Sequence, residues 1–384
     1  MTFPIAQFKQ TDTPFYYYDL PLLRSTLSKI KEVIAPHPKY HVHYAVKANA
    51  NKRILETIAE YGLGADCVSG GEITLAHETG FANDNIVFAC VGKSDNEIRT
   101  ALALGIHSFN VESIPELEVI NQLALEMHTT ANVAFRVNPN VDAHTHAKIT
   151  TGLNENKFGI DIDDLIEAIH KANYMRGGIK FVGLHFHIGS QILDLEVYKH
   201  LCQRINELQD MLEKEGIRAQ SINVGGGLGI NYANPDAEPI PDFESYFAII
   251  TNHLKLRDYQ ELHFELGRSV VGQCGTLISR TLYVKEGHEK RFVIVDAGFT
   301  DLIRPAMYGA HHCTQNISTD EQEKLETYDV VGPICESSDV FGTNERLPHT
   351  KRGDIIAFRS AGAYGEVMAS TYNCRKLPKA YYGE

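Results

Sequence analysis

Hydrophobic positions recur with two alternating periods along the first two thirds of the chain. Short β-branched or aromatic runs predict strands at residues 40–46, 64–68, 85–89, 108–111, 132–137, 181–188, 221–224 and 262–266. Stretches with an apolar residue every three to four positions predict helices over 52–61, 96–104, 115–127, 163–172 and 195–214. Gly62, Gly80, Gly105 and Gly216 stand just past helical stretches, where a left-handed cap favours glycine.

This alternation predicts a parallel sheet built from about eight βα units, the number and size of a closed (β/α)₈ TIM-like barrel. A doubly wound open sheet is the structural alternative, but no Gly-x-Gly-x-x-Gly follows the first strand. After about Ser269 strand-like runs replace the helical periodicity, at 275–284, 291–295, 328–331 and 354–358. We therefore expect a barrel over 22–267 and an all-β domain formed by 1–21 and 268–384. The strand-like run at 15–19 would join that β domain, and 309–324 would be a loop.

Charge and cysteine content narrow the class of protein. The 384 residues include 36 Lys and Arg against 49 Asp and Glu, a formal net charge of −13, which disfavours nucleic acids and anionic membranes as partners. Seven scattered cysteines form no Cys-x-x-Cys pair and no zinc spacing, which favours a reducing compartment. No signal-peptide pattern opens the chain and no apolar run could span a membrane, so we expect a cytoplasmic protein.

Polar residues stand where the predicted barrel strands end, which is where such barrels place their active sites. Lys47 follows strand 1 and could act as an amine nucleophile. Gly225–Gly227 after strand 7 and Gly267-Arg268 after strand 8 could hold a phosphate. His187 after strand 6 could lie over a flat ring, and Glu265 could pair with a pyridine nitrogen.

Each of these residues also has a plain structural reading: a solvated lysine, glycines required by packing, a satisfied histidine, an acid paired with Arg268. Their conjunction at the ends of four strands of one barrel favours a pyridoxal 5′-phosphate (PLP) site. In the β domain Cys335 follows a strand among polar residues and could donate a proton. Arg304, Tyr308 and Tyr364 lie in loops punctuated by Gly or Pro.

Long, order-preserving motifs carry a family resemblance over nearly the whole chain. They are Tyr44-Ala-Val-Lys47-Ala-Asn49, Gly64-Ala-Asp66-Cys-Val-Ser69-Gly-Gly-Glu72, His185-Phe-His187-Ile-Gly-Ser190-Gln191, Gly225-Gly-Gly-Leu-Gly229, Asp296-Ala-Gly-Phe299, Arg304-Pro-Ala-Met-Tyr308, Cys335-Glu336-Ser337 and Tyr364-Gly365. With them the chain resembles the diaminopimelate decarboxylases, PLP enzymes of the alanine-racemase/ornithine-decarboxylase fold type. The resemblance implies decarboxylation of meso-2,6-diaminopimelate to L-lysine and CO₂, the last step of lysine biosynthesis.

The resemblance also assigns roles to individual residues. Lys47 would hold PLP covalently, His187 would stack on its ring and Glu265 would pair with its nitrogen. The residues implied at the phosphate or the turn beside it are Ser190, Gly226, Gly227, Gly267 and Arg268. The residues implied at the substrate are Arg268, Arg304, Tyr308, Glu336 and Tyr364, with Tyr364 also touching the cofactor. The family completes its active site across a homodimer interface, so Cys335 would be a proton donor to the neighbouring subunit's site.

Two departures from the family pattern and three rival functions stay open. Leu266 stands where the family has proline, and the segment from Tyr308 to His312 differs from the commoner form.

One rival function is that of a decarboxylase for carboxynorspermidine or another basic amino acid on the same fold, or of a racemase. Another is a metal-dependent barrel hydrolase using the pairs His41/His43, His144/His146 and His185/His187. A third is a non-enzymatic PLP carrier, which would need no proton donor such as Cys335.

Overall fold

The computed structural model describes residues 3–141, 157–175, 177–319 and 324–384. The chain divides into two compact units, each described here by itself. One unit holds residues 27–229 and 242–267, and the other holds residues 1–26, 230–241 and 268–384. Among the described residues, no helix is both long and apolar enough to cross a bilayer.

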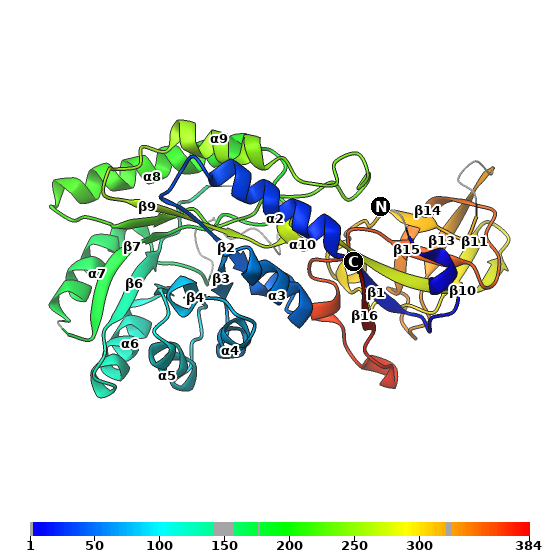
Figure 1. Cartoon of the computed structure of the whole chain (residues 1–384), viewed down its shortest axis with the longest axis horizontal. Coiled ribbons are helices and arrows are strands. Elements are labelled where there is room, and N and C mark those ends of the chain that lie inside the picture. Colours follow the sequence, from blue (N-terminus) through cyan, green and yellow to red (C-terminus); the bar gives the residue numbers. More distant parts are fainter. Residues whose placement is uncertain (1–2, 142–156, 176, 320–323) are drawn as a thin grey trace. The chain divides into compact units, whose positions relative to one another are not determined.

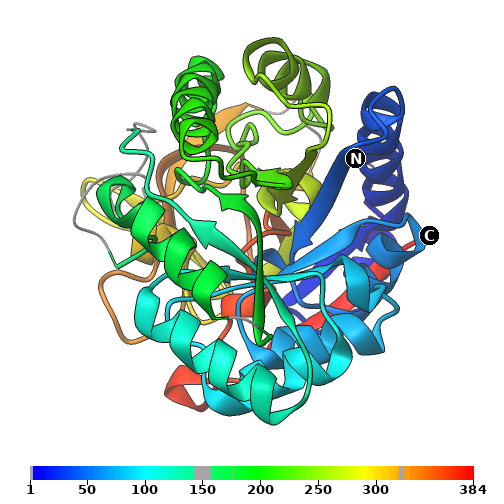
Figure 2. The same ribbon diagram turned by 90° about the vertical axis from the view of Figure 1, so that its left-hand side faces the viewer.

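The larger unit is a closed barrel of parallel strands, which confirms the predicted fold class. Its strands in order are β2 (Tyr40–Ala45), β3 (Gly64–Cys67), β4 (Ile86–Ala89), β5 (Ser108–Val111), β6 (Ala131–Arg136), β7 (Ile179–His185), β8 (Ser221–Asn223) and β9 (Glu261–Leu266). β2 pairs with β9 and so closes the barrel, with His43 opposite Glu265. Figure 2 looks into this unit and shows its helices on the outside of the strands.

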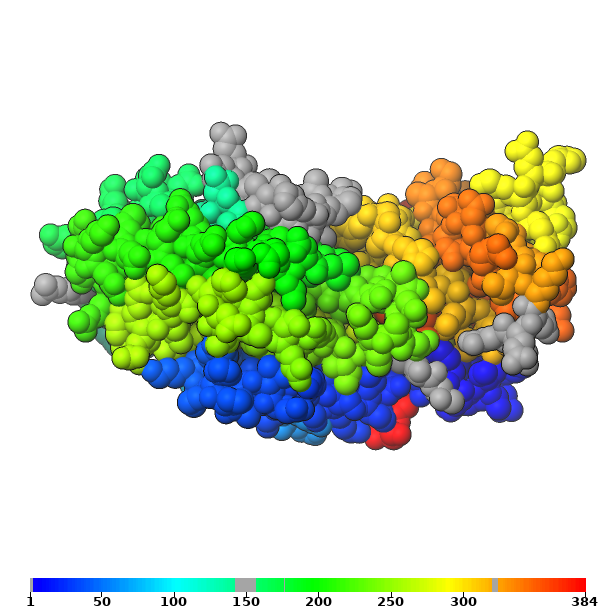
Figure 3. All heavy atoms as spheres, turned by 90° about the horizontal axis from the view of Figure 1, so that it is seen from above, coloured from blue at the N-terminus to red at the C-terminus, as the bar shows by residue number. Residues whose placement is uncertain are grey.

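Helices follow the strands along the chain, as Figure 1 shows with their labels. They are α2 (Leu20–Ile34), α3 (Lys52–Glu60), α4 (Gly70–Glu78), α5 (Asp95–Leu104), α6 (Ile114–Glu126), α7 (Ile162–Tyr174), α8 (Glu196–Lys214) and α9 (Phe243–His253), with short 3₁₀ turns η1 (Val46–Ala48) and η2 (Asn83–Asn85). Asn206 of α8 donates a hydrogen bond to the His253 carbonyl that ends α9, and in Figure 3 the two helices form adjoining green and yellow-green surfaces. The glycines expected as caps have positive φ, for example 65° at Gly105.

The smaller unit is a β-sheet unit, as predicted for the C-terminal third. Its strands are β1 (Phe15–Asp19), β10 (Gly275–Glu286), β11 (Arg291–Val295), β12 (Thr314–Asn316), β13 (Leu325–Val331), β14 (Val340–Pro348), β15 (Ile355–Phe358) and β16 (Lys379–Gly383). Short helical turns are α1 (Ile5–Phe8), α10 (Arg268–Val271), α11 (Arg304–Tyr308), η3 (Glu366–Met368) and η4 (Tyr372–Cys374). The hydrogen-bonded strand order is β12-β15-β10-β11-β13-β14.

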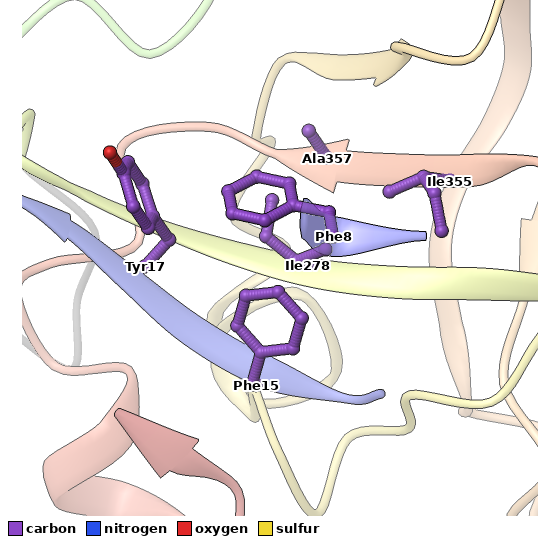
Figure 4. Close-up of a cluster of buried hydrophobic side chains, with 6 residues drawn as sticks. All are labelled: Phe8, Phe15, Tyr17, Ile278, Ile355 and Ala357. Carbon is purple, nitrogen blue, oxygen red and sulfur yellow. The ribbon is translucent and has the colours of Figure 1, made fainter. Parts of the chain in front are cut away.

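The N-terminal strand joins this sheet, which confirms that part of the predicted fold. β1 pairs antiparallel with β10 and parallel with β16, so the first and last strands of the chain are neighbours. Phe8, Phe15 and Tyr17 pack around Ile278, and Ile355 and Ala357 of β15 complete this cluster (Figure 4). Burial of these side chains stabilises the sheet by about 1.5–3 kcal/mol for each large apolar group.

Two segments differ from their predicted place. The expected loop 309–324 contains the short strand β12. Its residues are polar and show no apolar strand pattern, because Thr314 and Asn316 face a buried polar network. Residues 230–241, expected in the barrel, belong to the β-sheet unit. The physical reason is a set of bonds within that unit: the Cys313 N–H donates to the Tyr232 carbonyl, and the Arg359 guanidinium pairs with Asp236 at 2.7 Å.

Candidate active site

Lys47 lies in the η1 turn that directly follows β2, at the carboxyl end of the barrel. Its Nζ donates a hydrogen bond of 2.8 Å to Asp66 Oδ2 on the neighbouring strand β3. The Asp66 side chain is fully buried, and burial together with the charge of Glu265 raises its pKa, although Lys47 opposes this. Asp66 Oδ1 has no hydrogen-bond partner among the described residues. This end of the barrel therefore has a buried oxygen that can still accept a hydrogen bond.

Glu265, near the end of β9, is a buried carboxylate held by three donors. His185 Nε2 donates to Oε2 at 2.9 Å, while the side-chain amides of Asn110 and Asn223 donate to Oε1 at 3.2 and 2.8 Å. Burial alone would raise the pKa of Glu265, but the charge and hydrogen bond of His185, with Lys47 nearby, hold the pKa well below its usual range. The side chain is therefore an ionised acceptor, the form that a protonated pyridine nitrogen requires.

His187 lies just after β7, on the same side of the barrel as Glu265. Burial, with the cations Arg136 and Lys47, holds the pKa of His187 well below its ordinary value. The imidazole is therefore neutral at physiological pH, and such a ring can stack on another planar ring without the cost of burying a charge. Ser190 follows in the same loop and is half-buried.

The glycine-rich turn after β8 packs tightly against the end of β9. A Cβ at Gly226 would lie 1.8 Å from the carbonyl oxygen of Glu265, and Gly227 has a φ of +102°. Close packing alone therefore requires glycine at Gly226, which supports the structural reading of this residue. The same approach places the turn directly beside the backbone of Glu265.

Gly267 packs against the turn that carries Lys47. A Cβ at this position would lie 3.0 Å from the Cβ atoms of Ala45 and Ala48. Leu266, the departure from the family's proline, is fully buried as the last residue of β9 and pairs with Tyr44. A leucine in this place completes the strand and fills the core, so the departure removes no polar group from the site.

The β-sheet unit holds a second cluster, built from two buried arginines and three tyrosines. Arg268 donates a hydrogen bond of 2.6 Å to the Tyr232 hydroxyl, and its guanidinium lies 4.9 Å from the ring of Tyr364. Tyr364 has a φ of +56°, a conformation that costs an ordinary residue free energy and that is concentrated at functional sites. Tyr308 ends α11 and is half-buried.

Arg304 is the other arginine, and only 5% of its surface is exposed. Its guanidinium lies 4.6 Å from the ring of Tyr232, and its Nη1 donates to His312 Nε2 at 2.9 Å. Within the described ranges Arg304 has no carboxylate ion-pair partner. A buried guanidinium without an acid in contact with it is energetically unfavourable unless an anion reaches it.

His312 fixes the direction of Arg304. Its Nδ1 bonds to the Arg359 carbonyl at 2.9 Å, and since a carbonyl only accepts, the proton is on Nδ1 and Nε2 is the acceptor for Arg304. Burial and the charge of Arg304 lower the pKa of His312 to about 3, which keeps the acceptor form. The unusual Tyr308–His312 segment therefore contains a supporting residue that the sequence alone did not reveal.

Cys335 and Glu336 lie in the loop after β13, and both are exposed. The Cys335 backbone N–H bonds to Asn373 Oδ1 at 3.3 Å, and Tyr372 donates to Glu336 Oε1 at 2.9 Å. Both contacts are with the η4 segment, which holds the loop at the surface of its unit. All seven cysteines are free thiols.

The histidine pairs predicted as alternative metal ligands lie in different places. His185 is hydrogen-bonded to Glu265, His41 lies near the start of β2 and so away from Lys47, and His43 is hydrogen-bonded to His263. His144 and His146 lie outside the described residues. Sequence reasoning missed Asp66, Asn110, Asn223 and His312 as members of the two clusters. Only Asp66 stood in a quoted motif; the two asparagines lie on strands and give no local signal.

Comparison with known proteins identifies the family. A model of the family described as "Pyridoxal-dependent decarboxylase, pyridoxal binding domain" matches residues 23–272. A diaminopimelate decarboxylase of Bacteroides thetaiotaomicron is 62% identical over 379 residues, covering 99% of this chain and 97% of the relative. The crystal structure of a Helicobacter pylori diaminopimelate decarboxylase complexed with L-lysine has a TM-score of 0.92 and 40% identity, covering 99% of this chain and 94% of that one.

The chain belongs to the diaminopimelate decarboxylase family. It is therefore a PLP-dependent amino-acid decarboxylase, and the family match decides against the barrel hydrolase and the non-enzymatic carrier. A lysine/ornithine decarboxylase of Vibrio vulnificus, at 23% identity and a TM-score of 0.84, shares the fold.

The residues of the barrel cluster fit PLP. They offer a lysine amine, a neutral histidine ring and an ionised buried carboxylate, with a glycine turn that leaves no room for a Cβ beside the backbone carbonyl of Glu265. Lys47, His187 and Glu265 are thus the groups that would hold the cofactor.

Proposed function

We propose that this chain decarboxylates meso-2,6-diaminopimelate to L-lysine and CO₂. The barrel cluster serves the cofactor and the cluster in the β-sheet unit serves the substrate, with Arg268 and Tyr364 assigned to both. The observation that carries the choice of substrate is Arg304, a buried guanidinium without an acidic partner in the described part of the chain. Meso-diaminopimelate has a carboxylate at its far end, and ornithine and lysine have none. A site for a distal ammonium would instead need an acid at this place.

The barrel cluster serves the cofactor. When bound, PLP supplies the electron sink for the pair of electrons left by the departing CO₂. Lys47 Nζ is the amine that holds the cofactor, and Asp66 orients that amine through the 2.8 Å hydrogen bond. Glu265 stays ionised and holds a proton on the pyridine nitrogen, because His185 and two asparagines already fix both of its oxygens. His187 covers the ring face, and Ser190, Gly226, Gly227, Gly267 and Arg268 serve the phosphate.

The cluster in the β-sheet unit reads the substrate. Arg304 binds the distal carboxylate in the orientation that His312 sets, and Arg268, Tyr308 and Tyr364 complete the contacts. Tyr232 supports both guanidinium groups, since it lies 4.6 Å from Arg304 and accepts a hydrogen bond from Arg268. Neighbouring tyrosines stabilise two close cations without neutralising them, which leaves charge available for the substrate.

Protonation of the substrate carbon is assigned to Cys335 of the neighbouring subunit in a homodimer, with Glu336 contacting the substrate. Support comes from the family resemblance and from the exposure of both residues on their own chain. An exposed thiol becomes a positioned acid only when another surface covers it.

The free state of all seven cysteines supports a reducing, cytoplasmic location.

The test is turnover of the purified holoenzyme with meso-diaminopimelate, L-lysine, L-ornithine and carboxynorspermidine as separate substrates. We expect CO₂ release and L-lysine formation from meso-diaminopimelate, with kcat/KM at least 100-fold above the other three. That ratio corresponds to about 2.7 kcal/mol, within the range of one desolvated guanidinium–carboxylate pair. Comparable turnover of carboxynorspermidine would contradict the proposal and favour a carboxynorspermidine decarboxylase.

A further inference from the structure

A group of potential metal ligands lies at the amino-terminal end of the barrel, away from the residues of the proposed active site. His41 of β2 is paired in register with His263 of β9, and Glu261 precedes His263 by two positions on the same face of β9. Glu265 lies farther along β9, next to its carboxyl end. These three residues therefore stand at the seam where the first and last strands close the barrel.

Their ligand atoms converge. The Nε2 atoms of His41 and His263 lie 3.8 and 3.7 Å from Glu261 Oε2, and one ligand atom from each residue lies within 4.8 Å of the others. A tetrahedral ion with bonds of about 2.0–2.1 Å separates its ligands by about 3.3 Å. Small rotations of the half-exposed His41 and the exposed Glu261 would bring the group to that geometry.

His263 is the decisive residue, because it is 3% exposed and its Nε2 has no hydrogen-bond partner among the described residues. Its tautomer follows from its neighbours. His43 Nδ1 bonds to the Asn85 carbonyl, so it carries the proton and His43 Nε2 is an acceptor. His263 Nδ1 lies 2.9 Å from that acceptor and must donate to it. The remaining nitrogen, Nε2, therefore presents a lone pair toward the carboxylate of Glu261.

The lone pair of His263 Nε2 and the carboxylate of Glu261 repel each other unless a cation lies between them. The Nε2 atom of His41 is also buried and unpartnered within the described residues. A buried imidazole that donates its other N–H to a fixed acceptor is the usual arrangement of a histidine that ligates a metal.

We propose that His41, His263 and Glu261 bind a divalent transition-metal ion of the Zn²⁺ type, which clips β2 to β9 and stabilises the closed barrel. Two imidazole nitrogens and one carboxylate oxygen suit Zn²⁺, and a water molecule would complete the tetrahedron. The ion joins residues more than 200 positions apart in the chain. Such a cross-link would lower the conformational entropy of the unfolded chain and so stabilise the folded one. This role is structural and separate from PLP chemistry.

A pocket lies beside Glu261, the exposed member of the group. Glu261 and His107 line a pocket of about 390 Å³, together with Lys180, Arg218 and Tyr259. The Arg218 guanidinium lies 5.5 Å from the ring of Tyr259, and Lys180 and Arg218 both line the pocket. Their charges will lower the affinity for a cation, so binding should be weaker than in a site surrounded by acids.

The experiment measures Zn²⁺ binding to the PLP-loaded wild-type protein after removal of metals with a chelator. Competition with a chromophoric chelator gives the affinity, elemental analysis after dialysis gives the stoichiometry, and thermal unfolding gives the shift in Tm. The test variant is His41→Asn/Glu261→Gln, both at least partly exposed positions outside the proposed active site. The matched control is His200→Asn/Glu207→Gln, the same chemical changes at exposed positions of α8.

We expect one Zn²⁺ per chain in the wild type and in the control, with a rise in Tm on adding Zn²⁺. The test variant should bind Zn²⁺ at least about 100-fold more weakly, beyond the 10–100-fold loss typical of a missing supporting residue, and show no rise in Tm. Unchanged decarboxylase activity and circular dichroism of the metal-free test variant establish that it is folded. Binding that is absent from the wild type, or equally strong in the test variant, overturns the proposal.

Discussion

Replacing Arg304 with alanine removes the group to which we assign substrate choice. In the structure this guanidinium is 5% exposed, donates to His312 and has no acidic partner among the described residues. A substrate carboxylate would therefore meet a desolvated cation already held in one orientation. Loss of a desolvated, charge-assisted pair of this kind costs about 2–5 kcal/mol. At about 1.4 kcal/mol per decade, kcat/KM for meso-diaminopimelate should fall by about 30-fold to about 4000-fold.

The assay is steady-state release of CO₂ by the holoenzyme, with the visible absorbance of bound PLP recorded on the same samples. The absorbance should be unchanged in Arg304→Ala, because the barrel cluster holds the cofactor. Arg304→Lys should recover only part of kcat/KM, since an ammonium lacks the planar fork that binds a carboxylate through two parallel hydrogen bonds. Arg291→Ala is the matched control: Arg291 lies in the same unit, but its guanidinium pairs with Glu286 and Glu326 at a partly exposed site.

Two results would refute the reasoning. If Arg304→Ala loses its bound PLP while the remaining holoenzyme keeps its preference for meso-diaminopimelate, Arg304 serves the cofactor. If Arg304→Ala and Arg291→Ala lose activity equally, the effect is a general destabilisation of the β-sheet unit. Thermal unfolding separates these cases, because losing the bond to His312 should cost only about 1 kcal/mol of stability.

Three further predictions concern the cofactor, the interface and pH. Lys47→Ala should lack the visible absorbance of covalently held PLP and nearly all turnover; a retained absorbance would show that another amine holds the cofactor. Lys47→Ala and Cys335→Ala should each be nearly inactive, yet regain activity when mixed and allowed to exchange subunits, whereas no recovery despite proven exchange would mean that each site is built within one chain. Burial lowers the pKa of His312 to about 3 against about 6.5 in the unfolded chain, so the unfolded state gains a proton first as the pH falls. Stability is complete above about pH 6.5 and should fall by about 1.4 kcal/mol per pH unit below it, about 2 kcal/mol at pH 5. Thermal unfolding from pH 7 to 5 checks this, and a His312→Gln variant with the same pH dependence would contradict it.

Local periodicity was sufficient to predict the barrel because each βα unit repeats the same pattern. The strands at Phe15–Asp19, Ser108–Val111 and Arg291–Val295 have the predicted bounds, and the other strands named from the sequence begin or end within a few residues of expectation. A parallel strand buried on both faces reads as a short apolar run, and an amphipathic helix reads as a 3.6-residue stripe. The short strand β12 was missed because its pattern is polar, and only its partner β15 makes it a strand.

Lys47, His187 and Glu265 could be predicted from sequence to lie at one rim of the barrel, since the strand ends of a parallel barrel converge there. The surroundings that give those residues their chemistry could not. Glu265 is ionised because His185, Asn110 and Asn223, from three other strands, donate to it. Arg304 has a set direction because His312 accepts from it, and His312 can accept because a carbonyl from Arg359 fixes its tautomer.

The amino-acid sequence by itself determined the order of the elements, the barrel with its β-sheet unit, and the motifs that identify the family. Only the tertiary structure decided which polar groups share a buried environment, because protonation states depend on charges and hydrogen bonds brought together from distant positions. His41 and His263 illustrate the difference. They are more than 200 residues apart and give no ligand spacing, yet the closure of β2 on β9 sets them side by side.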